Sequence, residues 1–304
     1  MSQNADINEK GNESVFAFAS FAEKYEKGTG GATRYVAQRL VSMSPPFSDG
    51  SVVLDNACGT GIVTEEIQRH LQSTTQGTDG NINVQVYGAD AAPPMVEIFQ
   101  AKVKHAKENG TWPNLKIVSL RTVPAEELDE TIVPSNSITH SYMNFGLFFC
   151  TDPVKAAGHI YRSLAPGGTA FITSWADLGY INAMRKTEKS CDPDSAELRM
   201  PFDEQWENPA YVKEVLQKAG FEQDNIKVVQ EDSFFRAKDM NEMASLHTDL
   251  FTMLIRGPKG WASEDARKQW TSKLIEFLST DDHFIQEENG VATRMRANVA
   301  ICKK

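Results

Sequence analysis

The sequence is poor in cysteine, with four among 304 residues. They are widely separated and form no C-x-x-C pair, standing at Cys58, Cys150, Cys191 and Cys302. Zinc sites and disulfide-stabilised small domains require clustered cysteines. We therefore expect no metal site and no disulfide framework, and we interpret Cys58 as a small packing residue.

Long apolar runs and stretches of basic residues are also missing. No run approaches the roughly 18 apolar residues of a membrane-spanning helix, and the first residues lack the basic and apolar regions of a signal peptide. The formal net charge is −10, and no cluster of lysine and arginine could follow a phosphate backbone. The sequence predicts a cytoplasmic protein that binds neither membranes nor nucleic acid, and it carries no signal for an oligomeric state.

The chain is long enough to bury the core of one large domain. Residues 1–13 are polar and predict a disordered tail, and residues 14–304 form the single predicted domain. A helical pattern interrupted by glycine covers residues 14–45. Further helical patterns over residues 237–280 predict an insertion before the last strand, which begins near Thr293 and should pair antiparallel at an edge of the sheet.

The most informative stretch is S-V-V-L-D-N-A-C-G-T-G at residues 51–61. Its apolar start predicts a buried strand, and Gly59 and Gly61 predict a sharp turn into a helix. Such a turn lets a ligand approach the backbone and the helix N-terminus, although the glycines alone could simply make a tight turn. A dinucleotide fingerprint needs a third glycine where Thr64 stands, so NAD is the weaker interpretation.

The motif D-x-A-x-G-x-G resembles the first motif of class I S-adenosylmethionine (SAM) dependent methyltransferases. The resemblance implies that SAM is the cofactor, with S-adenosylhomocysteine as its product. It also implies that Ala57, Gly59 and Gly61 lie against the amino acid and ribose parts. Asp55 is then expected to reach the cofactor's ammonium, directly or through water, because a carboxylate attracts a cationic ligand.

A second strand, Val84 to Asp90, also ends in an acid. The resemblance assigns Asp90 to the ribose hydroxyls, with Ala91 beside it. A dehydrogenase would also place an acid here, and a solvated helix cap is an alternative. Met95 matches a position that lies on the adenine, although a core methionine is equally consistent with the pattern.

After the third strand the family usually has an acid that binds the adenine amino group. Pro124 occupies that position here. The candidates for the adenine contact are therefore the backbone of Ala125 and the side chain of Glu126.

The fourth strand ends in the loop N-F-G-L-F-F. Ligands of doubly wound sheets bind beyond the carboxyl ends of the strands, so Asn144 and Phe145 are expected to flank the reactive methyl group and Phe148 to face the substrate. His140 lies in the middle of the strand, and we interpret it as structural. The L-x-P-G-G text before the fifth strand is a second match to the family.

In related small-molecule methyltransferases a segment before the first strand folds over the cofactor. Residues 14–45 are the candidate lid, in which Tyr25, Thr29 and Thr33 could reach the methionine end; packing on the body is the alternative for Tyr25. Residues 237–280 are the candidate substrate cap. Pocket candidates, with packing between helices as the alternative, are Trp175, Tyr180, Met184, His247, Phe251 and Met253.

The pattern of strand, helix and short turn predicts an α/β fold, a doubly wound and mostly parallel seven-stranded Rossmann-like sheet. V-L-D-N-A-C-G-T-G, T-H-S-Y-M-N-F-G-L and T-S-W resemble fungal methyltransferases of secondary metabolism, in particular the gliotoxin bis-thiomethyltransferase type. This implies methyl transfer to a thiol, hydroxyl or amine of a small molecule, mainly through proximity and desolvation. The alternatives are a protein-directed methyltransferase or regulator, and a SAM-binding fold that catalyses another reaction.

Overall fold

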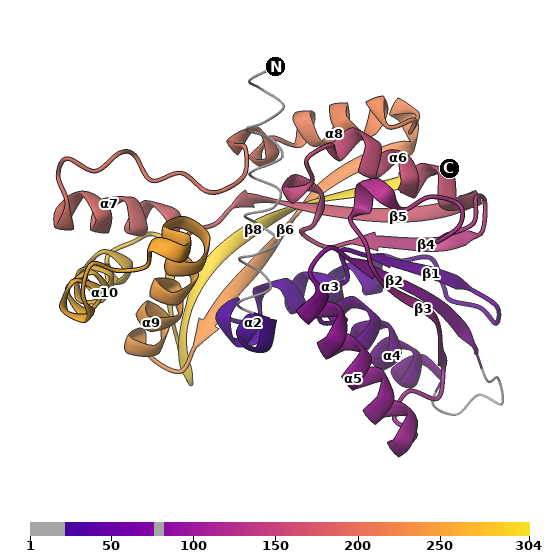
Figure 1. Ribbon diagram of the computed structural model, residues 1–304, viewed down its shortest axis with the longest axis horizontal. Coiled ribbons are helices and arrows are strands. Elements are labelled where there is room, and N and C mark those ends of the chain that lie inside the picture. The colour runs from indigo at the N-terminus through magenta and orange to yellow at the C-terminus, as the bar shows by residue number, and fades with distance from the viewer. Residues whose placement is uncertain (1–21, 76–81) are drawn as a thin grey trace.

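The centre of the molecule is a twisted sheet with the strand order β3-β2-β1-β4-β5-β8-β6, and a short strand, β7, pairs with β8 (Figure 1). The computed structural model describes residues 22–75 and 82–304. The predicted tail and residues 14–21 of the predicted lid lie outside the described residues. The strands are β1 (Val52–Asn56), β2 (Val84–Asp90), β3 (Leu115–Thr122), β4 (Ile138–Met143), β5 (Leu164–Asp177), β6 (Ile226–Ala237), β7 (Phe284–Glu287) and β8 (Gly290–Lys303).

The first five strands in sequence are parallel, and β8 runs antiparallel to both β5 and β6. This confirms the predicted seven-stranded, mostly parallel sheet. The expected place of the last strand is wrong, because β8 lies inside the sheet and β6 forms the edge. Strand β8 is mostly buried from Val291 to Cys302, whereas β6 is mostly half-buried or exposed. Strand β8 is flanked by strands at both edges, and α3 and α8 pack against it, which explains the long buried run.

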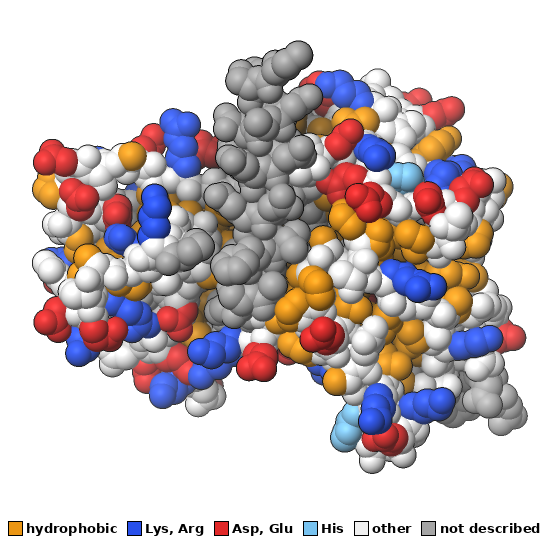
Figure 2. Space-filling model, viewed as in Figure 1, with side chains coloured by type: hydrophobic (Ala, Val, Ile, Leu, Met, Phe, Trp, Pro, Cys, Tyr) orange, Lys and Arg blue, Asp and Glu red, His pale blue; other side chains and the backbone are white. Residues whose placement is uncertain are grey.

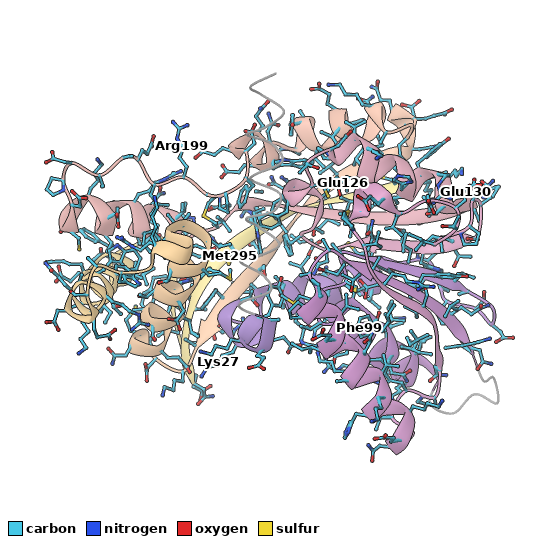
Figure 3. All side chains as sticks on the ribbon, viewed as in Figure 1. Lys27, Phe99, Glu126, Glu130, Arg199 and Met295 are labelled. Atoms are coloured by element: carbon cyan, nitrogen blue, oxygen red, sulfur yellow. The ribbon has the colours of Figure 1, made fainter. Side chains whose placement is uncertain are left out.

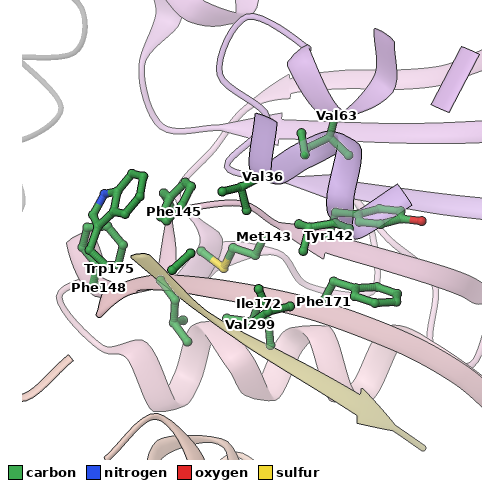
Figure 4. Close-up of a cluster of buried hydrophobic side chains, with 14 of the residues drawn as sticks. Val36, Val63, Tyr142, Met143, Phe145, Phe148, Phe171, Ile172, Trp175 and Val299 are labelled. Carbon is green, nitrogen blue, oxygen red and sulfur yellow. The ribbon is translucent and has the colours of Figure 1, made fainter. Parts of the chain in front are cut away.

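Helices cover both faces of the sheet. Figure 1 shows α3, α4 and α5 on one face and α6 and α8 on the other. The helices of this body are η1 (Ala22–Lys24), α2 (Tyr25–Gly28), α3 (Ala32–Met43), α4 (Ile62–Thr75), α5 (Pro93–Asn109), η2 (Ala125–Glu127), η3 (Leu147–Phe149), α6 (Pro153–Ser163), η4 (Glu204–Glu207), α8 (Pro209–Lys218) and η5 (Gln223–Asn225). A continuous apolar cluster fills the space between sheet and helices, and Figure 4 shows the part around Tyr142, Phe171 and Trp175.

A second group of helices stands beside the body, at the left of Figure 1. It contains α7 (Ile181–Cys191), α9 (Met240–Phe251), a π-helical turn (Thr252–Arg256), η7 (Gly257–Lys259) and α10 (Glu264–Ser279). All but α7 belong to the predicted insertion. Helix α7, which the sequence analysis did not connect with it, joins this group because Trp270 Nε1 donates a 2.8 Å hydrogen bond to Glu188.

The described part of the N-terminal segment is tied to α4 and α5 by an ion-pair network. The Arg34 guanidinium lies 2.5 Å from carboxylate oxygens of Glu65 and Glu66 and also pairs with Glu26. Lys102 of α5 lies 3.0 Å from Glu65 and 3.4 Å from Glu26. Because only 4% of the Glu66 side chain is exposed, its charge depends on these partners.

The network predicts that Arg34→Met destabilises the fold. We expect the free energy of unfolding to fall by about 1–3 kcal/mol, because Glu66 stays buried and keeps only Arg69 as a partner. Urea titration followed by circular dichroism measures the change. The control Lys218→Met breaks an exposed pair with Glu214 and should change stability by less than about 0.5 kcal/mol. Equal effects of the two variants would contradict a structural role for the network.

Candidate active site

The predicted ligand loop joins β1 to α4 in a strained conformation. Ala57, Gly59 and Gly61 have φ angles of 52°, 53° and 84°, and the Cys58 N–H donates a 2.9 Å hydrogen bond to the Ala89 carbonyl at the end of β2. A Cβ on Gly61 would stand 2.4 Å from the ring of Phe99, which Figure 3 labels on α5. Glycine is therefore needed at residue 61 for both its φ angle and its close packing.

Asp90 fastens this loop to the start of α5. Its Oδ2 accepts a hydrogen bond of 2.8 Å from the Gly59 N–H, and its Oδ1 accepts one of 2.9 Å from the Ala92 N–H. Burial raises the pKa of the Asp90 carboxyl above its ordinary value. A carboxylate has about four lone-pair sites, so each oxygen can accept a further hydrogen bond from a ligand.

Asp55 is buried at the tip of β1, with 1% of its surface exposed. Its Oδ2 accepts hydrogen bonds from the Thr64 N–H at 3.2 Å and from the Thr64 hydroxyl at 2.7 Å. The threonine that breaks the dinucleotide fingerprint is thus the partner of the acid. Burial, with a smaller contribution from Asp90, raises the pKa of Asp55 to about 7. Among residues 22–75 and 82–304, no lysine or arginine pairs with either acid.

The residues expected near the adenine follow β2 and β3 in the chain. Ala91 occupies the bend between β2 and α5. Met95 is buried in a small cluster with Ala22 and Ala92, against which Tyr25 packs. Ala125 is buried in η2.

The Glu126 side chain already has hydrogen-bonding partners in the protein. Its Oε1 accepts hydrogen bonds from the N–H groups of Thr151 and Asp152 at 2.7 and 3.3 Å. The Glu126 side chain therefore ties η2 to the residues that precede α6. Of the two expected adenine contacts, the backbone of Ala125 is the one that this arrangement favours.

The loop after β4 holds Phe145 in the left-handed region, with φ at 59°. Such a conformation costs a non-glycine residue about 1–3 kcal/mol and must be held by its surroundings. The Phe145 N–H donates a 2.8 Å hydrogen bond to Thr173 Oγ1, which donates to Asn144 Oδ1 at 3.1 Å. Asn144 Nδ2 donates to the Thr33 carbonyl at 3.1 Å. This chain of bonds fixes the Phe145 ring on Trp175, with ring centroids 3.8 Å apart and an interplanar angle of 12°.

Thr173 holds this loop and was not singled out in the sequence analysis, although it begins the quoted T-S-W text. The Asn144 amide, expected beside the reactive methyl group, is used to connect β4, β5 and α3. His140 is buried, and its ring stacks on that of Phe47. The His140 Nε2 atom lies 3.1 Å from the Pro45 carbonyl oxygen. That position agrees with its structural interpretation.

The polar side chains expected from the lid meet one another. The Tyr25 hydroxyl is hydrogen-bonded to Thr33, and burial raises its pKa to about 12. Thr29 Oγ1 lies 3.3 Å from Thr33 Oγ1.

These side chains reach a cavity between strands β5, β6 and β8, the N-terminal segment and the inserted helices. The space free of protein atoms there amounts to about 600 Å³, which includes space open to solvent, and its lining is mostly apolar. Among the described residues, its lining contains no histidine, carboxylate, lysine or arginine. The lining residues are Tyr25, Thr29, Ala32, Thr33, Phe145, Phe148, Phe149, Trp175, Leu178, Tyr180, Met200, Phe202, Phe235, Leu250, Met253, Leu254 and Met295; Figure 3 labels Met295.

Phe251, one of the predicted pocket residues, does not belong to the lining of this cavity. It is 2% exposed and its ring stacks on Trp270 of α10 at 4.4 Å. Successive helical residues are about 100° apart, so Leu250 faces the cavity while Phe251 faces the neighbouring helix. Met184 and His247 also lie outside the lining, whereas Phe145, Phe148, Trp175, Tyr180 and Met253 belong to it.

The visible surface carries side chains of both charge signs. On the face shown in Figure 2, lysine and arginine side chains are interspersed with aspartate and glutamate. No helix in the described part of the chain has the length and apolar character needed to cross a bilayer. Across the same residues, no three histidine, cysteine or acidic side chains form a metal-ligating group.

Comparison with known proteins finds similarity to methyltransferases. The family model described as a methyltransferase domain matches residues 54–172. The methyltransferase tpcH of Aspergillus fumigatus is 24% identical over 286 residues, which cover 91% of this chain and 93% of tpcH. The acetylaranotin bis-thiomethyltransferase of Aspergillus terreus is 25% identical over 185 residues, 59% of this chain and 57% of that protein.

A solved structure shows the same fold. Phosphoethanolamine N-methyltransferase 2 of Haemonchus contortus, in complex with phosphomonomethylethanolamine and S-adenosylhomocysteine, matches with a TM-score of 0.50 and 17% identity. The match covers 94% of this chain and 60% of that one. Together with the strand order and the glycine loop, this match shows the fold of class I SAM-dependent methyltransferases. The family model and tpcH show that the chain is similar in sequence to methyltransferases.

Proposed function

We propose that this enzyme transfers a methyl group from SAM to a thiol, hydroxyl or amine of a small, largely apolar acceptor of secondary metabolism. One observation carries the proposal. Tyr25, Thr29 and Phe145, which the sequence assigns to the cofactor, also line the apolar cavity. A cofactor on the glycine loop would therefore present its reactive end to that cavity.

The residues around the glycine loop fit SAM. Asp90 would hold the ribose hydroxyls with its remaining lone pairs, while the bends at Ala57 and Gly59 leave room for the ribose and the amino acid part. The ammonium would lie near Asp55, which lacks a basic partner in the described structure. Met95 and the backbone of Ala125 would contact the adenine. When bound, SAM supplies a methyl group that the sulfonium charge already activates.

The protein's own contribution is positioning and removal of water. Phe145 and Trp175 form a stacked wall that desolvates the reacting groups, and aromatic faces also favour a nearby cation. The described cavity lining has no histidine, lysine or carboxylate that could act as a general base. A thiol suits such a site, because it can react as its thiolate without a strong base in the protein.

The cavity favours a small molecule over a polypeptide substrate. The described residues of the proposed lid (14–45) and of the proposed cap (237–280) both contribute to its walls, through Tyr25 and Leu250 among others. A protein-directed enzyme would instead need an open groove beside the methyl donor. The similarity to tpcH and to a bis-thiomethyltransferase supports the choice of a secondary metabolite.

Incubation with methyl-labelled SAM and separate small-metabolite and protein extracts tests the proposal. We expect label in small molecules, and Asp90→Asn serves as a variant with impaired cofactor binding. Label in polypeptides would overturn the small-molecule assignment. Cofactor binding with no transfer to either extract would favour a different reaction on the same fold.

Asp90→Asn should weaken the binding of S-adenosylhomocysteine by roughly 1.5–3 kcal/mol, about 10- to 150-fold, because one charged acceptor for the ribose hydroxyls is lost. Asparagine keeps one side-chain oxygen and so preserves a bond to the loop. Isothermal titration calorimetry measures the affinity. Asp224→Asn, at an exposed acid in η5, is the matched control and should leave affinity unchanged. An unaltered affinity in Asp90→Asn would remove the ribose assignment.

The raised pKa of Asp55 predicts that cofactor affinity depends on pH. An ammonium favours the ionised carboxylate, and burial holds the pKa of the free protein's Asp55 at about 7. Affinity for S-adenosylhomocysteine should therefore be nearly constant above that pH and should fall as pH drops through 7, by up to about tenfold per unit below it.

Calorimetry from pH 6 to 8.5 tests whether the affinity falls as the pH is lowered. Asp55→Asn should bind more weakly and with little pH dependence over the same range. A variant that retains the full pH dependence would show that another group is responsible.

A further inference from the structure

Two neighbouring polar side chains beside the cavity have no hydrogen-bonding partner. Tyr180 lines the cavity, and its hydroxyl forms no hydrogen bond to any described residue. Behind it, His247 of α9 is completely buried, and neither ring nitrogen has a partner. The His247 ring centroid lies 4.4 Å from that of Tyr180 and 4.1 Å from that of Phe235, another residue of the cavity wall.

The other hydroxyl groups of the described wall already have partners. Tyr25 and Thr29 both bond to Thr33, on the side of the N-terminal segment. Tyr180 stands at the start of α7 and faces the same space from the side of the inserted helices. Among the hydroxyl groups of the described lining, Tyr180 is therefore the one that is free to bind a ligand.

Leaving polar groups unpaired is costly. An unsatisfied buried donor or acceptor destabilises a fold by about 1–3 kcal/mol, and burial alone lowers the pKa of His247 to about 3, so its ring is neutral. A neutral imidazole offers one donor and one acceptor, and a phenol can act as either. Two such groups side by side in an otherwise apolar wall are typical of a binding site in which the ligand supplies the missing hydrogen-bonding partner.

We propose that Tyr180 and His247 form a polar subsite that recognises a hydroxyl, thiol or carbonyl group on an otherwise aromatic or alicyclic acceptor. This proposal rests on the proposed function. Tyr180 makes the first hydrogen bond from the wall of the cavity. His247 supplies a second bond when the Tyr180 ring tilts to admit the acceptor. The apolar remainder of the acceptor packs against Phe145, Trp175 and Phe235.

A matched ligand pair tests the subsite without knowledge of the natural acceptor. 2-Naphthol and naphthalene differ by one hydroxyl, and calorimetry on the full chain loaded with S-adenosylhomocysteine gives both affinities. We expect 2-naphthol to bind at least tenfold more tightly than naphthalene. Tyr180→Phe should reduce that preference to less than about threefold and leave naphthalene binding unchanged. Tyr211→Phe, at a tyrosine of α8 outside the cavity lining, is the matched control.

His247→Leu provides a second, independent measurement. Removal of an unpaired buried imidazole should raise the melting temperature by about 2–4 °C. If His247 only fills space, the preference for 2-naphthol stays at its wild-type value; the subsite predicts that it falls at least threefold.

Three results would overturn the subsite: equal binding of the two ligands by the wild type, binding of neither, or an unchanged preference in both Tyr180→Phe and His247→Leu. Failure of the proposed function is separable, because it would appear as absent S-adenosylhomocysteine binding or absent transfer of label. Retained cofactor binding with any of the three results counts against the subsite alone.

Discussion

The carboxylate of Asp90 is the contact on which the cofactor side of the molecule depends. It binds the Gly59 N–H in the loop after β1 and the Ala92 N–H before α5, so one side chain sets the separation of two strand-to-helix turns. In the proposed function the remaining lone pairs of the same oxygens would accept hydrogen bonds from the cofactor. Because Asp90 lies close enough to help raise the pKa of Asp55, the proposed site holds two carboxylates that a cationic ligand would stabilise.

A second set of hydrogen bonds connects this region to the acceptor cavity. Thr173 of β5, Asn144 after β4 and Thr33 of α3 form a continuous chain, and the strained backbone of Phe145 is held at its centre. The sheet, the lid and the stacked pair of Phe145 and Trp175 are thereby fixed relative to one another. The proposed function uses no general base from the described cavity wall, so it depends on this rigidity to position the reacting groups.

The inserted helices give the cavity its chemical character. They contribute apolar side chains such as Leu250 and Met253, and they place His247 behind Tyr180 without a polar partner. The ion pairs of Arg34 with Glu65 and Glu66 hold the proposed lid against α4. The two flanking segments therefore differ in their chemistry: the lid brings bonded hydroxyl groups, and the inserted helices bring apolar surface with two unsatisfied polar groups.

Local sequence patterns determined the central part of this protein. The apolar run before Asp55 lies within a few residues of the glycine turn, and Asp90 directly ends the second apolar strand. Short-range sterics and hydrogen bonding decide such local structures. The parallel arrangement of the first five strands also followed from repeated strand, helix and turn. These features predicted the fold and the family, and they led to the proposed cofactor contacts.

Contacts between distant segments decided the rest. Strand β8 lies between β5 and β6, and its hydrogen bonds on both sides join residues far apart in sequence. The periodicity of a strand does not specify its partners, so the sequence pattern could not predict this position. Phe251 packs on Trp270 and does not line the cavity. The Glu126 carboxylate accepts a hydrogen bond from Thr151, and the Thr64 hydroxyl donates one to Asp55. In each case a neighbouring element sets the orientation of the side chain. The isolation of Tyr180 and His247 is likewise a property of tertiary packing, because whether a polar group lacks a partner depends on every element around it.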